Sequence, residues 1–139
     1  MLAGVKLPSE SGLIAHSDGD VLVHAVMDAL LSAAGLLDIG HYFPDTDARF
    51  AGADSMKLLD SVMALVKKEG LAPMNVSVSV LAERPRLAPY IDAMRAKLAT
   101  ALGISPSAVG IAAGTNEKLG YVGEGKGITV YAVALLAKI

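Results

Sequence analysis

The apolar positions along the chain predict three helices separated by polar segments. Over residues 21–36 the apolar side chains recur every three or four positions, and a glycine marks the end of the pattern. The same spacing returns over residues 55–69 and 89–102, and each of these patterns also ends at a glycine. Residues 37–54 are polar and rich in turn-forming residues, so they are expected to form a loop.

A different periodicity predicts strands. Residues 75–81 (NVSVSVL) alternate polar and apolar side chains, which is typical of a strand buried on one face. Residues 109–113 form a second short apolar segment, and a further strand is expected around Val5. Residues 128–137 (ITVYAVALLA) are apolar almost throughout, which predicts a central strand or one covered on both faces. The glycine-rich residues 114–127 are expected to form a loop.

These elements predict an α+β fold, a mixed β-sheet with helices packed on one face, in one domain over residues 1–139. The chain is 53% hydrophobic and 19% charged, so some apolar side chains either face other copies of the chain or fill a large core. A net charge of −2 gives no support for nucleic-acid binding, and no apolar run is long enough to cross a membrane. The first residues lack the pattern of a secretory signal, and cysteine is absent, as expected of a cytoplasmic enzyme.

The chemistry of the chain is concentrated in residues 16–47. This segment contains all three histidines, six aspartates, and neither lysine nor arginine. Carboxylates gathered without cations of their own repel one another, so an external cation is expected there. A metal site that meets phosphate is the first hypothesis.

Two histidines in this segment have different settings. His24 and Asp28 are four residues apart in a predicted helix and share a face, so Asp28 could bind a metal with His24 or orient its imidazole. A purely structural pairing is the simpler alternative. His16 and Ser17 precede the same helix, where a hydroxyl, an imidazole and free backbone amides suit an anion. Nearby, Asp20 is expected to be the N-cap of the helix.

Other polar residues lie on predicted loops. Asp38 could bind the hydroxyls of a polyol, whereas residues 45–47 (Asp-Thr-Asp) have the composition of a simple turn. Thr115 could donate a hydrogen bond to phosphate, and Glu117 could hold Mg²⁺ against it. Arg86, in the segment ERPRLAP, could reach a diphosphate.

Four segments together resemble the 2-C-methyl-D-erythritol 2,4-cyclodiphosphate synthase family of the non-mevalonate isoprenoid pathway. They are HSDGDVLVHAVMDALLSAAGLLDIGHYFPDTD, GADS, ERPRLAP and TNEKLGYVGEGKGI, and they occur in one order over nearly the whole chain. The resemblance implies a homotrimer with its active sites between subunits. It also implies that the 2-phosphate of a cytidine-diphosphate sugar alcohol attacks its own β-phosphorus, releasing CMP and a cyclic diphosphate.

The resemblance also implies a role for each matching residue. His24 is a Zn²⁺ ligand, Glu117 holds Mg²⁺ or Mn²⁺, and the catalytic residues His16 and Thr115 flank the reacting phosphates. The remaining matches are expected to bind substrate, and Asp38 and Gly40 among them take the methylerythritol hydroxyls. These substrate-binding residues are Ser17, Asp38, Ile39, Gly40, Phe43, Pro44, Asp45, Asp47, Ala82, Pro85, Arg86, Leu87, Ala88, Ala113, Gly114, Tyr121 and Glu124.

The sequence departs from the family pattern at three places. The family's early Asp-x-His strand, which supplies two zinc ligands, has no counterpart before Val5, so we expect a shortened chain that retains zinc weakly. Glu124 stands where the family has an arginine, and Lys126 is the expected substitute for its charge. Gly114 and Asn116 interrupt a run normally rich in threonine.

Two other functions are compatible with these residues. One is a non-catalytic trimer of the same fold that binds a cytidine nucleotide or an isoprenoid diphosphate. The other is a metal-dependent phosphohydrolase, which only the aspartate and histidine segment favours. The reaction product separates these alternatives, because hydrolysis gives open phosphates rather than a cyclic one.

Overall fold

The computed structural model describes residues 1–7, 20–44, 54–82, 86–114 and 128–139. Its elements follow in the order α1 (Val21–Ala33), α2 (Ile39–Tyr42), α3 (Ser55–Lys68), β1 (Leu71–Leu81), η1 (Ala88–Tyr90), α4 (Ile91–Leu102), η2 (Pro106–Ala108), β2 (Val109–Gly114) and β3 (Thr129–Lys138). The prefix η marks a short 3₁₀ helix. No helix within these residues is long and apolar enough to span a membrane.

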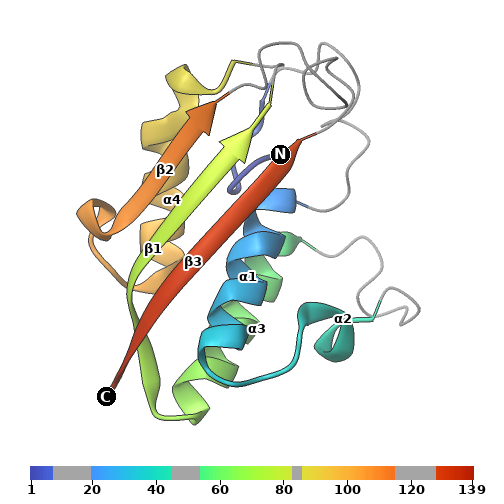
Figure 1. Ribbon diagram of the computed structural model, residues 1–139, viewed down its shortest axis with the longest axis vertical. Coiled ribbons are helices and arrows are strands. Elements are labelled where there is room, and N and C mark those ends of the chain that lie inside the picture. Colours follow the sequence, from blue (N-terminus) through green and yellow to red (C-terminus); the bar gives the residue numbers. More distant parts are fainter. Residues whose placement is uncertain (8–19, 45–53, 83–85, 115–127) are drawn as a thin grey trace.

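The described strands form a mixed sheet in the order β2-β1-β3, with β1 in the centre (Figure 1). β1 runs parallel to β2 and antiparallel to β3. Val78, in the middle of β1, pairs with Ile111 on one side and with Ala132 on the other. The predicted mixed sheet is therefore confirmed.

Helices α1, α3 and α4 lie behind the sheet in Figure 1 and cover one of its faces. The alternation predicted for β1 is confirmed, because Val76, Val78 and Val80 are buried toward these helices while the serines between them are exposed. Apolar side chains from all three helices complete the core; fully buried examples are Leu22, Met27, Leu30, Leu59, Val62, Met94 and Leu98. Burial of these side chains supplies the main stabilisation of the fold.

The opposite face of the sheet is open in the described structure. On β3, Tyr131, Val133 and Leu135 are 64%, 71% and 55% exposed. Among the described residues the prediction that residues 128–137 form a central or doubly covered strand is therefore wrong, since β3 is an edge strand of the described sheet. An apolar run predicts that a strand is covered, but it does not distinguish cover by the same chain from cover by another copy.

The helices agree with the predicted ranges within a few residues at each end. Gly103 caps α4 in the left-handed conformation with φ of 69°, which glycine adopts without steric cost. The short helix α2 was not predicted, because four residues are too few for a periodic pattern. Val5 forms only an isolated bridge with Leu2, so the strand expected around it is wrong.

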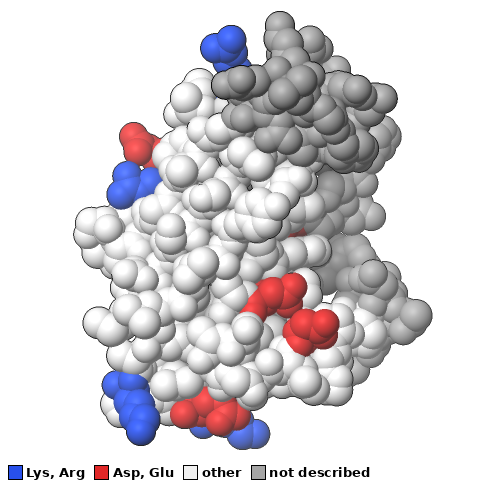
Figure 2. All heavy atoms as spheres, viewed as in Figure 1, with Lys and Arg blue, Asp and Glu red and all other residues white. Residues whose placement is uncertain are grey.

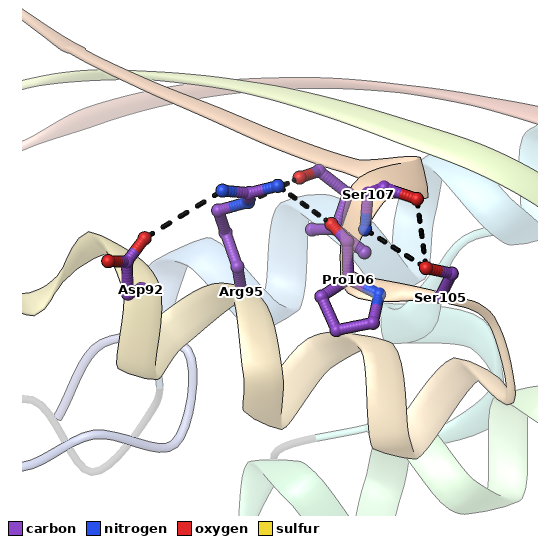
Figure 3. A network of polar contacts seen from close by, with 6 residues as sticks. Asp92, Arg95, Ser105, Pro106 and Ser107 are labelled. Atoms are coloured by element: carbon purple, nitrogen blue, oxygen red, sulfur yellow. Dashed lines mark hydrogen bonds and ion pairs between the residues drawn. The ribbon is translucent and has the colours of Figure 1, made fainter.

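An arginine fastens α4 to the start of β2 (Figure 3). Arg95 Nε donates to the Val109 carbonyl oxygen at 2.8 Å, and its Nη2 donates to the Pro106 carbonyl oxygen at 2.9 Å. The ion pair with Asp92 is longer, at 3.7 Å, and the Asp92 side chain is 98% exposed. The two carbonyl bonds therefore make the attachment, and the ion pair adds little.

Candidate functional site

A buried carboxylate at the start of α1 organises one side of the candidate site. Asp20 is 4% exposed. Its Oδ1 accepts the Val23 N–H at 3.1 Å, which confirms the predicted N-cap. Its Oδ2 accepts the Gly4 N–H at 2.7 Å, so the same side chain holds the N-terminal segment against α1.

The same cap brings a serine onto the His24 imidazole. The backbone N–H of Asp20 donates to Ser55 Oγ at 3.1 Å, and Ser55 Oγ lies 3.3 Å from His24 Nε2. Ser55 is 6% exposed and is the first residue of α3. The sequence reasoning missed this residue, although it lies in the segment GADS that carried part of the family resemblance.

Asp28 has a different partner from the one considered first. Its Oδ1 accepts the N–H of Ile39 at 2.9 Å, so this carboxylate ties α2 to α1. The hydrogen-bonding group that the structure places on His24 Nε2 is Ser55 rather than Asp28. This contact favours the structural interpretation of Asp28.

The segment expected to bind a polyol forms the start of α2. Asp38 is its N-cap, and its Oδ1 accepts the His41 N–H at 3.0 Å. Asp38 and Gly40 are exposed, and Ile39 is held by Asp28. Because Asp28 lies one turn after His24, α2 is attached to α1 on the face that carries His24.

Two other candidate residues close α2. Phe43 donates its N–H to the Ile39 carbonyl oxygen at 2.7 Å, and its ring centroid lies 6.5 Å from that of Tyr42. Pro44 follows and is partly buried. The predicted substrate segment from Asp38 to Pro44 is thus one compact turn of chain against α1.

The candidate nucleotide-binding residues meet at the carboxyl ends of the parallel strands β1 and β2. Leu81 pairs with Gly114, and the Ala82 N–H donates to the Gly114 carbonyl oxygen at 3.0 Å. Ala113 lies next to Gly114 on β2, so the segments around Ala82 and Ala113 are side by side. This is the edge at which parallel strands commonly present ligand-binding loops.

The residues that follow β1 complete this end of the molecule. Ala82 and Leu87 are buried, whereas Arg86 and Ala88 are exposed. The exposed guanidinium of Arg86 has the right chemistry for binding a phosphate.

Within the described residues, the segment from Asp38 to Pro44 and the carboxyl ends of β1 and β2 do not form one site. Figure 1 shows α2 and the carboxyl ends of β1 and β2 at separate parts of the molecule.

Several predicted residues lie outside the described ranges, and the structure does not test them. They are His16, Ser17, Asp45, Asp47, Pro85, Thr115, Glu117, Tyr121 and Glu124. Among the residues that are described, no group of three or more histidine, cysteine, aspartate or glutamate side chains is arranged to hold a metal ion. The described donors alone therefore do not fit a closed zinc site, and His24 remains a predicted ligand.

Comparison with known proteins gives consistent matches over nearly the whole chain. The family model described as the YgbB family matches residues 1–137. A 2-C-methyl-D-erythritol 2,4-cyclodiphosphate synthase from Symbiobacterium thermophilum is 53% identical over 137 residues, which cover 99% of this chain and 87% of that protein.

Solved structures match the fold as well. The bifunctional IspDF of Campylobacter jejuni is 40% identical with a TM-score of 0.93, and the match covers 100% of this chain and 38% of that one. A 2C-methyl-D-erythritol-2,4-cyclodiphosphate synthase in its CDP-bound form is 38% identical with a TM-score of 0.88, covering 99% and 89% of the two chains. The α+β fold is thus shared with these enzymes.

Proposed function

This chain belongs to the YgbB family, and from that premise we propose that it is a cyclodiphosphate-forming enzyme. It would convert 4-diphosphocytidyl-2-C-methyl-D-erythritol 2-phosphate to 2-C-methyl-D-erythritol 2,4-cyclodiphosphate with release of CMP. The observation that carries the proposal is the 53% identity to the Symbiobacterium thermophilum synthase over 99% of this chain. The phosphorus-oxygen lyase class and a cytoplasmic setting belong to the same proposal.

The reaction requires the substrate to fold back on itself. An oxygen of the 2-phosphate bonds to the β-phosphorus, the bond from that phosphorus to the oxygen bridging to the α-phosphorus breaks, and CMP leaves with that oxygen. Both reacting groups belong to one molecule, so the protein contributes mainly orientation and charge neutralisation. Two separate binding subsites, one for each end of the substrate, would orient the reacting phosphates toward each other.

The described residues supply candidates for both subsites. The adjacent ends of β1 and β2, with Ala82 bonded to Gly114, would receive the cytidine diphosphate. The exposed Asp38 and Gly40 at the start of α2 would receive the methylerythritol hydroxyls. By their positions in the family motif, His16 and Thr115 would flank the two phosphates.

We assign the metals by the same motif. His24 is the candidate ligand of Zn²⁺, and Glu117 is the candidate ligand of Mg²⁺ or Mn²⁺. A divalent cation at the phosphates would offset their negative charge. Because His24 is the one zinc ligand that the motif assigns here and a closed zinc site takes at least three protein ligands, we expect the purified protein to hold zinc at well below one ion per chain. Elemental analysis showing a full, tightly bound zinc complement would contradict this expectation.

We propose that the enzyme works as a homotrimer. The sheet face opposite the helices carries exposed Tyr131, Val133 and Leu135, and Figure 2 shows no charged side chain over the middle of the three strands. Apolar surface of this kind is characteristic of an interface between subunits.

A non-catalytic trimer of the same fold is the alternative. Glu124, where the family has an arginine, is the feature that favours it, because a carboxylate repels diphosphate. Such a protein would bind a cytidine nucleotide or an isoprenoid diphosphate and leave it intact.

The deciding experiment is ³¹P NMR of the purified chain with 4-diphosphocytidyl-methylerythritol 2-phosphate, Mg²⁺ and added Zn²⁺. CMP and a cyclic diphosphate are expected in equal amounts. Open phosphates would identify a phosphohydrolase instead. Unchanged substrate together with saturable binding of CDP would support the non-catalytic trimer and reject the synthase.

A further inference from the structure

The imidazole of His24 is held by a contact that no pattern in the sequence indicates. Ser55 Oγ lies 3.3 Å from His24 Nε2, although the two residues are 31 positions apart in the chain. Ser55 is buried at the first position of α3, and His24 is partly buried in α1. The contact therefore lies where the two helices meet and is partly buried.

The serine hydroxyl is itself fixed in place. It accepts the backbone N–H of Asp20 at 3.1 Å, and Asp20 is anchored through its carboxylate to Gly4 and Val23. A hydroxyl has one proton and two lone pairs, and the Asp20 N–H uses one of the lone pairs. One proton and one lone pair remain for the imidazole.

This arrangement occupies Nε2 in either protonation form of the neutral ring. When Nε2 is bare, the hydroxyl can donate its proton to it, and Nδ1 carries the ring proton. When Nε2 is protonated, it can donate to the remaining lone pair of the hydroxyl, and Nδ1 is bare. In both cases Nδ1 is the nitrogen left for another partner.

We propose that Ser55 is a positioning residue for His24, which holds Nε2 and thereby makes Nδ1 the nitrogen that the site uses. The hydroxyl can reverse its direction, so it supports the ring in either neutral form, and Nδ1 is the nitrogen that would meet a cation if one were bound there. Histidines that bind metals commonly have their second ring nitrogen held in this way. The inference rests on the proposed function only in taking His24 as part of the site.

Asp28 does not compete for this role, although it is the neighbour on the same helix face. Its Oδ1 accepts the Ile39 N–H at 2.9 Å and so serves α2. Ser61, on the same helix as Ser55, is exposed and bonds only back to the Lys57 carbonyl oxygen, at 3.4 Å, within the described structure. Ser61→Ala is therefore a matched control for Ser55→Ala.

The test is NMR of protein labelled with ¹⁵N in its histidine rings, free of metal, at a pH where imidazole is neutral. The chain has only three histidines, so His16→Gln and His41→Gln assign the signals. In the wild type we expect the His24 Nε2 signal to be shifted by its hydrogen bond to Ser55, whichever ring nitrogen carries the proton. In Ser55→Ala the Nε2 signal should move toward its value in the urea-unfolded chain.

Two further variants separate orientation from general damage. Ser55→Thr keeps the hydroxyl and should restore the His24 signals, and Ser61→Ala should leave them unchanged. Identical His24 signals in the wild type and in Ser55→Ala would overturn the proposal. If Ser55→Ala does not fold, wild-type His24 nitrogens that match those of the unfolded chain would overturn it equally.

The outcome is independent of turnover. A wild-type chain that shows the expected His24 signals but forms no CMP would reject the proposed synthase and leave the role of Ser55 standing. If the wild-type chain forms CMP but Ser55→Ala changes no His24 ring signal, the proposed synthase stands and the role of Ser55 is rejected.

Discussion

At the scale of single residues, one carboxylate connects three parts of the chain. Asp20 caps α1 through Val23, holds the N-terminal segment through Gly4, and offers its own backbone N–H to Ser55. All three hydrogen bonds are buried. If one of them were lost, water could not reach the N–H donor to take the place of the missing acceptor. Asp20 is thus more than a helix cap.

Replacing Asp20 tests whether it stabilises the fold more than a simple helix cap does. Asp20→Ala should lower the free energy of unfolding by about 2 to 3 kcal/mol. The substitution removes the cap of α1 and leaves the buried N–H groups of Gly4 and Val23 without an acceptor. Asp54→Ala is the matched comparison, since Asp54 caps α3 through Met56 but is exposed. That variant should lose only about 1 kcal/mol. Urea unfolding gives both values, and equal losses would contradict the connecting role.

Asp20 and Ser55 are hydrogen-bonded to each other, but the sequence predicts the role of only one of them. Asp20 was predicted as an N-cap because capping follows from residues a few positions away, and the structure confirms it. Ser55 could not be assigned to His24, because their contact depends on how α1 and α3 pack across 31 positions. Local rules therefore find the cap, and only tertiary structure finds the partner of the imidazole.

At the scale of elements, two side chains fix the positions of helices that border the candidate site. Arg95 fastens α4 to the start of β2, the strand that ends at Ala113 and Gly114. Asp28 fastens α2, which carries Asp38 and Gly40, to α1. Neither side chain belongs to the proposed binding residues.

Arg95→Ala should lower the free energy of unfolding by about 2 to 3 kcal/mol, because the carbonyl oxygens of Val109 and Pro106 lose their charged hydrogen-bond donor. Arg95→Lys should recover only part of this, since an ammonium does not reproduce the planar fork of the guanidinium. Asp92→Ala is the control and should change nothing measurable, because the side chain of Asp92 is 98% exposed. Thermal unfolding monitored by circular dichroism compares the three variants.

Asp28→Ala should raise KM for the cytidine-diphosphate substrate about fivefold and leave kcat nearly unchanged. The lost bond to Ile39 is worth about 1 kcal/mol, and it holds a binding segment rather than a reacting group. Asp28→Asn keeps an oxygen acceptor and should stay close to the wild type. A fall in kcat at constant KM would show that Asp28 acts on the chemical step instead.

The elements also show where sequence patterns stop being informative. The alternation over residues 75–81 predicted β1 and its buried face correctly, because a period of two has one structural explanation. The pattern began four residues late, since Leu71 to Met74 do not alternate cleanly. For α2 the sequence offers only the N-cap Asp38, because four residues are too few for a periodic pattern and the position of the helix depends on Asp28 from α1.

At the scale of the whole molecule, the open sheet face predicts assembly. Val133 lies at the middle of β3, pairs with Ser77 and is 71% exposed. Val133→Asp would place a carboxylate in the proposed interface, where burying it unpaired is costly.

Sedimentation at micromolar concentration should therefore show a trimer for the wild type and a monomer for Val133→Asp. Ala64→Asp is the control and should remain trimeric, because Ala64 is exposed on α3 in the helical layer. A wild-type chain that sediments as a monomer would remove the basis for a shared site.

The composition of β3 also bears on how safely the chain can exist alone. Residues 128–137 contain no proline, glycine or charge, and β3 is an edge strand of the described sheet. A long apolar edge of this kind is a template for intermolecular β-pairing and for amyloid-like stacking. Newly made chains are therefore at risk of aggregation until they join the proposed trimer. Val133→Asp, by placing a charge in that edge, should yield a monomer that stays in solution.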